Sequence, residues 1–458
     1  MRFLRDAPRW LLLAALVYAP WDYGGTTELA IVRLDWMLGL AVSFWLFGWI
    51  RRGMLAQTSA PRILWAVSFL LLALGWWMVA NAKAIYDSDY YMFVKIARPL
   101  AWAPGSLDQA VSAAWMIRAT TLIGTICLVA DRFHDPQWLL RLWTTLAATG
   151  GSIAFLGLIQ KASGAPMIFW KAVDPPLKTF FATFYYHGNA GAFLNLTLPV
   201  TIGLAVRSFT RPSPPTVRAL WLVLALVSAV AVFANTSRMA QILGAAIVVS
   251  LTLGLGPTLF AAAQRRRFDW RMALIGASAI LCALFAVVRY SQLDRSLQRW
   301  ERISETVPRD ARWLASKAAV RALPEASWLG FGPGTFHIVF PYYTAGFDAR
   351  LRGEWIYLHE DYLQTLLEWG LLGGALWACL VFGGIAVALR NRISAAAQTW
   401  TPRQRFLLPL VLWGLASVLL HALVDFPLQI ASIQLYVATY LGICWGSSRW
   451  RGSAALPR

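Results

Sequence analysis

Twelve apolar runs are the feature that most limits how this chain can fold. A helix needs about 20 apolar residues to cross a bilayer, and most of the runs reach that length. Only 14% of the 458 residues are charged, whereas soluble domains carry about 25%. The sequence therefore predicts an all-α polytopic membrane protein with about twelve transmembrane helices. The runs lie near residues 10–21, 29–50, 62–82, 109–130, 139–159, 188–206, 217–234, 238–262, 272–289, 362–389, 406–421 and 427–447.

Basic residues gather in alternate connections between these runs. The segment 51–62 and the stretch 265–271 are rich in arginine, whereas 21–28 and 422–426 hold no basic residue. Cytoplasmic connections carry the excess of Lys and Arg, so we expect both termini in the cytoplasm. The net charge of +19 then reflects membrane topology and does not point to a nucleic-acid partner.

This topology divides the chain into three regions. Residues 1–289 hold the first nine helices, 290–361 form one large extracytoplasmic loop, and 362–458 hold the last three helices and a cytoplasmic tail. Apolar spacing predicts an amphipathic helix over 291–323 of the loop. The glycines and proline of GFGPGTF (330–336) predict a tight turn there.

Most histidines fall on the extracytoplasmic side. These are His187, His337, His359 and His421, and only His134 faces the cytoplasm. In so apolar a chain, this asymmetry points to chemistry outside the cell membrane.

The candidate base is His359, where the loop becomes the tenth helix. An imidazole accepts a proton near neutral pH, and the adjacent carboxylates of Glu360 and Asp361 are suited to hold its tautomer or to raise its pKa. The alternative is a polar helix start in which Asp361 is the N-cap and His359 is solvated.

Two arginines are candidate anion ligands. Arg238 follows Asn235, Thr236 and Ser237 at the start of the eighth run, and a helix N-terminus beside a guanidinium suits a phosphate-like anion. The alternative for Arg238 is a side chain that reaches to the interface. Arg312 is harder to distinguish, because most charges on a loop helix are simply solvated.

Other ionisable residues allow more than one interpretation. His421 and Asp425 are one helical turn apart at the outer end of the eleventh run, which suits either catalysis or a polar clasp between helices. Arg33, Asp35 and Arg118 lie within predicted helices, where an internal ion pair is the simplest account.

The segment 87–89 is a DxD triplet in the first sizeable outer loop. Such triplets bind divalent cations with sugar diphosphates in many glycosyltransferases, but a three-residue motif arises easily by chance. We therefore expect no metal site there.

Several stretches together resemble the O-antigen ligase and polymerase superfamily of bacterial membrane glycosyltransferases. The order and spacing of these stretches carry the resemblance, which spans roughly residues 150–447. They are HGNAGAFLNLTLPV (187–200), SRMA (237–240), ARWLASKAAVRALPEASWLGFGPGTF (311–336), LHEDYLQTLLEWGLLG (358–373) and LLHALVDFPLQI (419–430).

The resemblance implies a multi-pass protein of the bacterial inner membrane that works at its periplasmic face. It would transfer a glycan from an undecaprenyl-diphosphate donor to an acceptor hydroxyl, on a lipid or a glycan, with no metal, nucleotide sugar or other cofactor. His359 would be the base, and Arg238 and Arg312 would bind the donor diphosphate. The residues expected to support them are Glu360, Asp361, Tyr362, His421, Asp425 and His187.

Two positions depart from the family pattern. Glu360 stands where the family usually has Asn, and Met239 stands where it has Gly after the Ser-Arg pair. Both changes lie beside proposed catalytic groups, so they put the choice of donor and acceptor in doubt.

Two alternatives remain open. Within the superfamily, the last stretch slightly favours an exopolysaccharide or O-antigen polymerase over a ligase. Outside it, a flippase for lipid-linked glycans or another transporter also needs about twelve helices. A transporter should show internal repetition and helices broken near mid-membrane, and the sequence shows no such repetition.

Overall fold

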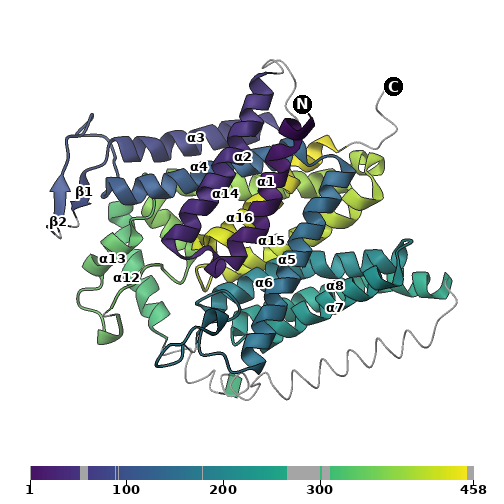
Figure 1. Cartoon of the computed structure of the whole chain (residues 1–458). Coiled ribbons are helices and arrows are strands. Elements are labelled where there is room, and N and C mark those ends of the chain that lie inside the picture. Colours follow the sequence, from purple (N-terminus) through teal and green to yellow (C-terminus); the bar gives the residue numbers. More distant parts are fainter. Residues whose placement is uncertain are drawn as a thin grey trace.

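The computed structural model describes residues 2–51, 60–87, 89–90, 92–177, 179–265, 300–301, 310–351 and 353–450. Helices dominate these residues, and one short antiparallel hairpin accompanies them (Figure 1). The helices are α1 (Arg2–Trp21), α2 (Glu28–Ile50), α3 (Arg62–Ala80), α4 (Gln109–Arg132), α5 (Pro136–Ala162), α6 (His187–Thr210), α7 (Pro215–Ala234), α8 (Arg238–Arg265), α12 (Ala311–Ala326), α13 (Phe336–Tyr343), α14 (Asp361–Ile393), α15 (Pro402–His421) and α16 (Ala431–Gly446); the strands are β1 (Ala84–Asp87) and β2 (Met92–Lys95).

The predicted all-α membrane architecture is confirmed. Nine helices in the described ranges, α2 to α8, α14 and α15, are long and apolar enough to cross a membrane. They coincide with nine of the predicted runs, and α1 and α16 occupy the first and last runs. The run at 272–289 lies outside the described residues, so the total of twelve stays a prediction.

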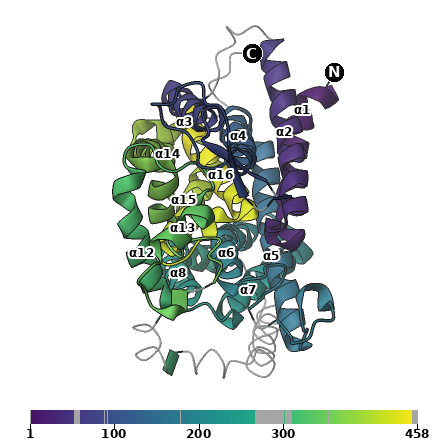
Figure 2. The same cartoon turned by 90° about the vertical axis from the view of Figure 1, so that its left-hand side faces the viewer.

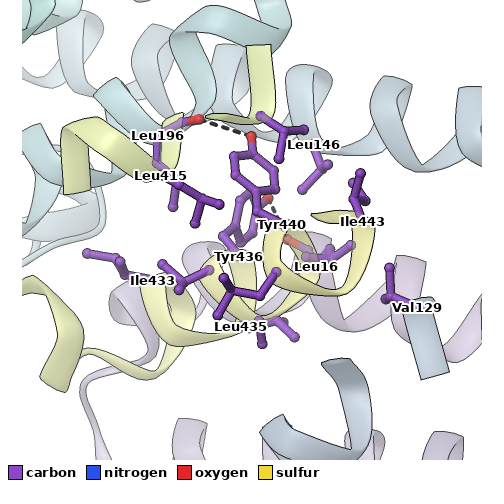
Figure 3. Close-up of a cluster of buried hydrophobic side chains, with 14 of the residues drawn as sticks. Leu16, Val129, Leu146, Leu196, Leu415, Ile433, Leu435, Tyr436, Tyr440 and Ile443 are labelled. Atoms are coloured by element: carbon purple, nitrogen blue, oxygen red, sulfur yellow. Dashed lines mark hydrogen bonds between the residues drawn. The ribbon is translucent and has the colours of Figure 1, made fainter. Parts of the chain in front are cut away.

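Helix α16 lies at the centre of the bundle, where every one of its residues from Ala431 to Gly446 except Gln434 is buried. It packs against α1, α4, α14 and α15. Two of its tyrosines reach backbone carbonyls of other helices, as Figure 3 shows: Tyr440 donates to Leu196 and Tyr436 to Leu16, each at 2.9 Å. A buried hydroxyl without a partner is costly, so these hydrogen bonds fix the depth of α16 against α6 and α1.

Local sequence explains where several helices begin. Asp108 and Asp135 accept backbone N–H groups at the starts of α4 and α5, which is the usual function of an N-cap carboxylate. Thr401 and Gln404 form a reciprocal capping box at the start of α15. With this capping box, α15 begins at Pro402, four residues before the predicted apolar run, which begins at residue 406.

One end of the bundle carries the hairpin together with α12 and α13, at the left of Figure 1. Figure 2 views this end directly, with α12 beside α14. Asp310 has an extended backbone and caps α12, so the helix predicted over 291–323 does not run through residue 310. An N-cap residue adopts non-helical angles, and apolar spacing alone misses that interruption. The earlier part of that prediction lies largely outside the described residues.

A break in α14 at Gly370 anchors this end to the bundle. Gly370 adopts φ 64° and ψ −171°, which frees backbone groups on both sides, and the segment 327–332 pairs with them. The hydrogen bonds are Phe331 N to Leu367 O, Gly332 N to Glu368 O and Leu372 N to Trp328 O, each 2.9 Å, and Leu371 N to Ser327 O at 3.2 Å.

The predicted tight turn at 330–336 is confirmed, and its glycines 330, 332 and 334 all have positive φ. Glu368 holds the turn in place, because its carboxylate accepts the N–H groups of Gly334 (3.0 Å) and Phe336 (3.3 Å). Helix α12 is therefore rigidly connected to α14 through backbone pairing.

Candidate active site

Four segments meet at the hairpin end of the bundle: the residues before α6, the start of α12, the start of α14 and the turn after α15. The backbone of Asp361 donates to Ala422 O at 3.0 Å. Its carboxylate accepts Leu428 N at 2.9 Å and Gln429 Nε2 at 2.8 Å. These contacts fix the start of α14, and with it His359, against the turn at 422–429.

His359 is paired with Asp425. Its Nδ1 lies 2.9 Å from Asp425 Oδ1, and the two side chains are 19% and 4% exposed. An ionised carboxylate only accepts hydrogen bonds, so Nδ1 carries the hydrogen and the neutral ring has its lone pair at Nε2. The pair therefore fixes the tautomer and orientation of a half-buried imidazole.

Tyr186 and Arg312 extend this pair into a chain of hydrogen bonds. The Tyr186 hydroxyl donates to Asp425 Oδ2 at 3.0 Å, and Arg312 Nη2 donates to the same hydroxyl at 2.6 Å. Arg312 Nη1 also lies 3.5 Å from Val424 O. The guanidinium, the phenol, the carboxylate and the imidazole thus form one continuous group.

Burial, hydrogen bonds and charges within this group shift the pKa values of Asp425 and Tyr186 in opposite directions. Burial acts to raise the pKa of Asp425, but the hydrogen bond from His359 and the charge of Arg312 outweigh it and hold this pKa below its usual value. Burial, followed by the charge of Asp425, raises the pKa of Tyr186. Asp425 is therefore ionised at neutral pH, and Tyr186 keeps its proton and donates it to the carboxylate.

The carboxylates next to His359 do not hold its tautomer. Glu360 is the N-cap of α14 and accepts Tyr362 N at 3.2 Å and Leu363 N at 2.8 Å. Asp361 is buried and occupied by the 428–429 backbone and amide groups. The expectation that either would orient the imidazole is wrong, because the first turn of α14 uses both. The alternative was wrong in detail too, since the cap is Glu360 and not Asp361.

His421 and Tyr362 lie beside these four residues but are not part of their chain of hydrogen bonds. His421 Nε2 is 3.8 Å from Asp425 Oδ2, so the predicted proximity is confirmed, but the distance exceeds that of a hydrogen bond. The His421 side chain is only 1% exposed. Tyr362 donates to Leu419 O at 2.7 Å and joins α14 to α15.

Arg238 lies outside this hydrogen-bonded chain. It begins α8, is half-buried, and follows a turn that Asn235 joins to α6 by donating from Nδ2 to His187 O at 2.9 Å. The His187 ring lies beside that of Tyr186, with 4.8 Å between centroids. The structure thus brings His359, Arg312 and Asp425 together. Arg238 lies at the same end of the bundle, where Asn235 and His187 connect the start of α8 to Tyr186.

Sequence reasoning missed Tyr186 and Phe426. The two rings stack with centroids 5.4 Å apart and planes 14° apart, and Phe426 packs edge-on against His359 at 4.8 Å. A tyrosine in an apolar chain gives no signal of its own. The glycine at position 188 is the one related sequence feature: a Cβ there would lie 2.3 Å from the Tyr186 ring and 2.4 Å from Asp425 Oδ2, so the close packing requires a glycine.

Two cavities lie at this end of the bundle, close to the hydrogen-bonded residues in the sequence. One, of about 300 Å³, lies between α4, α14 and α16 and is almost wholly apolar, with Tyr362 in its wall. The other, of about 320 Å³, lies between the end of α5, the 164–187 segment and the α7–α8 turn, and includes Lys161, His187 and Thr236 in its lining. The first cavity is thus mainly apolar and the second is of mixed polarity, and their linings include Tyr362 and His187, the neighbours of Asp361 and Tyr186 in the sequence.

Among the described residues, no three His, Cys, Asp or Glu side chains are grouped as metal ligands would be. In the DxD triplet, Asp87 Oδ1 accepts the N–H groups of Asp89 at 2.9 Å and Tyr90 at 3.2 Å. This carboxylate closes its own turn, as aspartates in turns commonly do. Ser88 lies outside the described residues.

Comparison with known proteins agrees with the sequence resemblance. Residues 222–378 match the model of a family described as O-Antigen ligase, a range that includes Arg238, Arg312 and His359. Tyr186 and Asp425 lie outside the matched range. No curated protein matches the chain. The family match over residues 222–378 and the polytopic helical fold support similarity to the O-antigen ligase superfamily of membrane proteins.

Proposed function

We propose that this protein transfers a glycan from an undecaprenyl-diphosphate donor to an acceptor hydroxyl at the periplasmic face of the bacterial inner membrane. The observation that carries the proposal is the pairing of His359 with buried Asp425 beside Arg312. Hydrogen bonds through Asp425 and Tyr186 link a base to a cation at one end of the bundle, and glycosyl transfer from a lipid diphosphate requires both groups.

His359 acts as the general base in this proposal. Because Nδ1–H is donated to Asp425, the lone pair of Nε2 accepts the proton of the acceptor hydroxyl. The hydroxyl oxygen attacks the anomeric carbon as the bond to the diphosphate oxygen breaks, and the configuration inverts. The imidazolium that forms is stabilised by the ionised Asp425 at 2.9 Å.

The arginines act on the leaving group. Negative charge on the lipid diphosphate rises as the glycosidic bond breaks, and a fixed guanidinium stabilises that charge more in the transition state than in the ground state. Arg312 is the nearer to His359, through Tyr186 and Asp425. Arg238 at the start of α8 adds a second cation and a helix N-terminus.

The donor is amphipathic, and its two chemistries match the surroundings of His359. The polar chain of residues lies at the end of the bundle, and the apolar cavity of about 300 Å³ lies directly inward of it along α14. A lipid-linked glycan places a charged diphosphate between an apolar chain and a sugar, which is the same order. Ligation to a lipid acceptor and polymerisation of repeat units both fit this arrangement.

The test is complementation of a strain that lacks this gene, with surface glycan followed by gel electrophoresis. Wild type is compared with His359→Ala, Arg238→Ala and Arg312→Ala at matched membrane levels. We expect all three variants to lose the glycan while lipid-linked donor accumulates at the periplasmic face. In a reconstituted assay, we expect transfer by the wild type to continue in EDTA. Product length then separates ligation from polymerisation.

Two results would count against the proposal. Normal glycan in the His359→Ala strain would exclude this residue as the base. Donor that accumulates on the cytoplasmic side would instead indicate the transporter alternative.

A further inference from the structure

Tyr186 lies in the middle of the hydrogen-bonded chain that runs from Arg312 to His359, and the sequence analysis did not identify it. Its hydroxyl accepts from Arg312 Nη2 at 2.6 Å and donates to Asp425 Oδ2 at 3.0 Å, while Asp425 Oδ1 holds His359. We propose that Tyr186 is a positioning residue that fixes the Arg312 guanidinium relative to the Asp425–His359 pair. This inference rests on the proposed glycosyl transfer and adds the group that aligns its base with its cation.

The other contacts of Arg312 are too long to fix its guanidinium. Val424 O lies 3.5 Å from Nη1, and Asp310 Oδ1 lies 3.8 Å from Nε. N–H···O hydrogen bonds are usually about 2.7–3.2 Å long, so the 2.6 Å contact with Tyr186 is the one that sets the direction of the guanidinium. Arginine has several rotatable bonds, and without this contact its planar head would sample more than one orientation.

Aromatic contacts hold the Tyr186 ring, and with it the hydroxyl, in place. The Tyr186 ring stacks on Phe426 and packs edge-on to His359, with centroids 5.4 and 6.0 Å apart. The glycine at 188 lets the ring and Asp425 lie close to the α6 backbone. Since aromatic packing holds the ring, removing only the hydroxyl should leave the fold intact and break both hydrogen bonds.

A loss of alignment has a kinetic signature. Arg312 would still attract the donor diphosphate by charge, because a mobile guanidinium keeps its attraction for an anion. Stabilisation of the developing charge depends on fixed geometry. Removal of the hydroxyl therefore lowers kcat and changes the donor KM little.

The experiment uses purified full-length protein and lipid-linked glycan extracted from the deletion strain as the donor. For Tyr186→Phe we expect kcat to fall about 10- to 100-fold, with donor KM within about threefold of wild type. The matched control is Tyr185→Phe, whose ring stacks on Tyr23 outside the chain, and we expect it to behave as wild type. A Tyr186→Phe enzyme with wild-type kcat, or one with a raised KM and unchanged kcat, would overturn the inference.

A double-variant comparison keeps the test valid if Tyr186→Phe lowers the fraction of folded protein. The rate ratio between Arg312 and Arg312→Lys is measured within each background, so that the folded fraction cancels. We expect about tenfold or more with Tyr186 present and less than about threefold in Tyr186→Phe, because contacting residues are not additive. Equal ratios in both backgrounds would also overturn the inference.

The failure of the inference differs from the failure of the proposed function. If the wild type transfers no glycan, or Arg312→Ala keeps full activity, the proposed function fails. If those two behave as expected and Tyr186→Phe resembles wild type, only the role of Tyr186 fails.

Discussion

Asp425 shows how one buried carboxylate organises the site. A buried charge is tolerated only when it is paired and hydrogen-bonded. Asp425 meets this requirement through His359, Tyr186 and its neighbour Phe426, whose N–H donates to Oδ1 at 3.1 Å. Removing any partner leaves part of the charge uncompensated, so the residues around Asp425 should act as a unit and not as independent contributors.

Gly188→Ala tests how tightly this unit is packed. A methyl group at this position would lie 2.3 Å from Tyr186 Cε1 and 2.4 Å from Asp425 Oδ2, so the phenol and the carboxylate must shift. Because a displacement of about 1 Å can cost about 100-fold in rate, we expect transfer to fall by about two orders of magnitude. The measurement is the transfer rate of purified protein. Gly39→Ala is the control, because a Cβ there has no atom of another described residue within 4 Å. Equal rates in the two variants would contradict the packing argument.

At the scale of elements, the break in α14 does more than bend a helix. A helix interior has no unpaired backbone groups, whereas the break at Gly370 exposes several to which the 327–332 segment binds. Unpaired backbone groups are costly inside a membrane protein, so the docked segment and the break require each other. This arrangement carries Arg312 on α12 to within reach of His359 on the start of α14.

Gly370→Ala should undo this docking. At φ 64° and ψ −171° the backbone lies in a region that essentially only glycine adopts, where another residue costs about 1–3 kcal/mol. The new Cβ would also lie 2.3 Å from Leu329 N and from Trp328 C. We therefore expect a lower melting temperature in detergent together with reduced transfer. Gly254→Ala in α8, where an added Cβ meets no atom of the described residues within 4 Å, should leave the melting temperature unchanged or slightly raised. An unchanged melting temperature for Gly370→Ala would show that the docking contributes nothing to stability.

At the scale of the molecule, the sequence predicted what depends on local composition. Each apolar run must pair its own backbone, so helices such as α3 and α7 lie within a few residues of expectation. The β1–β2 hairpin and the break at Gly370 were not predicted, because neighbouring residues do not determine which distant backbone a segment meets. The same holds for the site: His359, Arg312 and Asp425 were identified by type and motif, but the pairing across 66 residues and the role of Tyr186 arise only from the fold.

The last prediction concerns which side of the membrane each end of the helix bundle faces. The 96–108 segment lies on the same end as the site, since Leu107 N donates to Phe331 O at 3.0 Å and Ser112 Oγ to Pro333 O at 2.7 Å. Ile393 ends α14 at the other end, 32 residues after Asp361. From the distribution of basic residues, we expect the site end to face the periplasm. Trp102 and Ile393 are 84% and 88% exposed, so both positions suit a cysteine label.

In a background with all four native cysteines replaced, we expect a membrane-impermeant maleimide to label Trp102→Cys in intact spheroplasts. We expect Ile393→Cys to react only after permeabilisation, because its end of α14 carries Arg390 and Arg392 and the positive-inside rule assigns it to the cytoplasm. The opposite pattern would place His359 in the cytoplasm. A base on that side could not act on a donor presented at the periplasmic face, so the labelling pattern decides whether the geometry around Asp425 can carry out the proposed transfer.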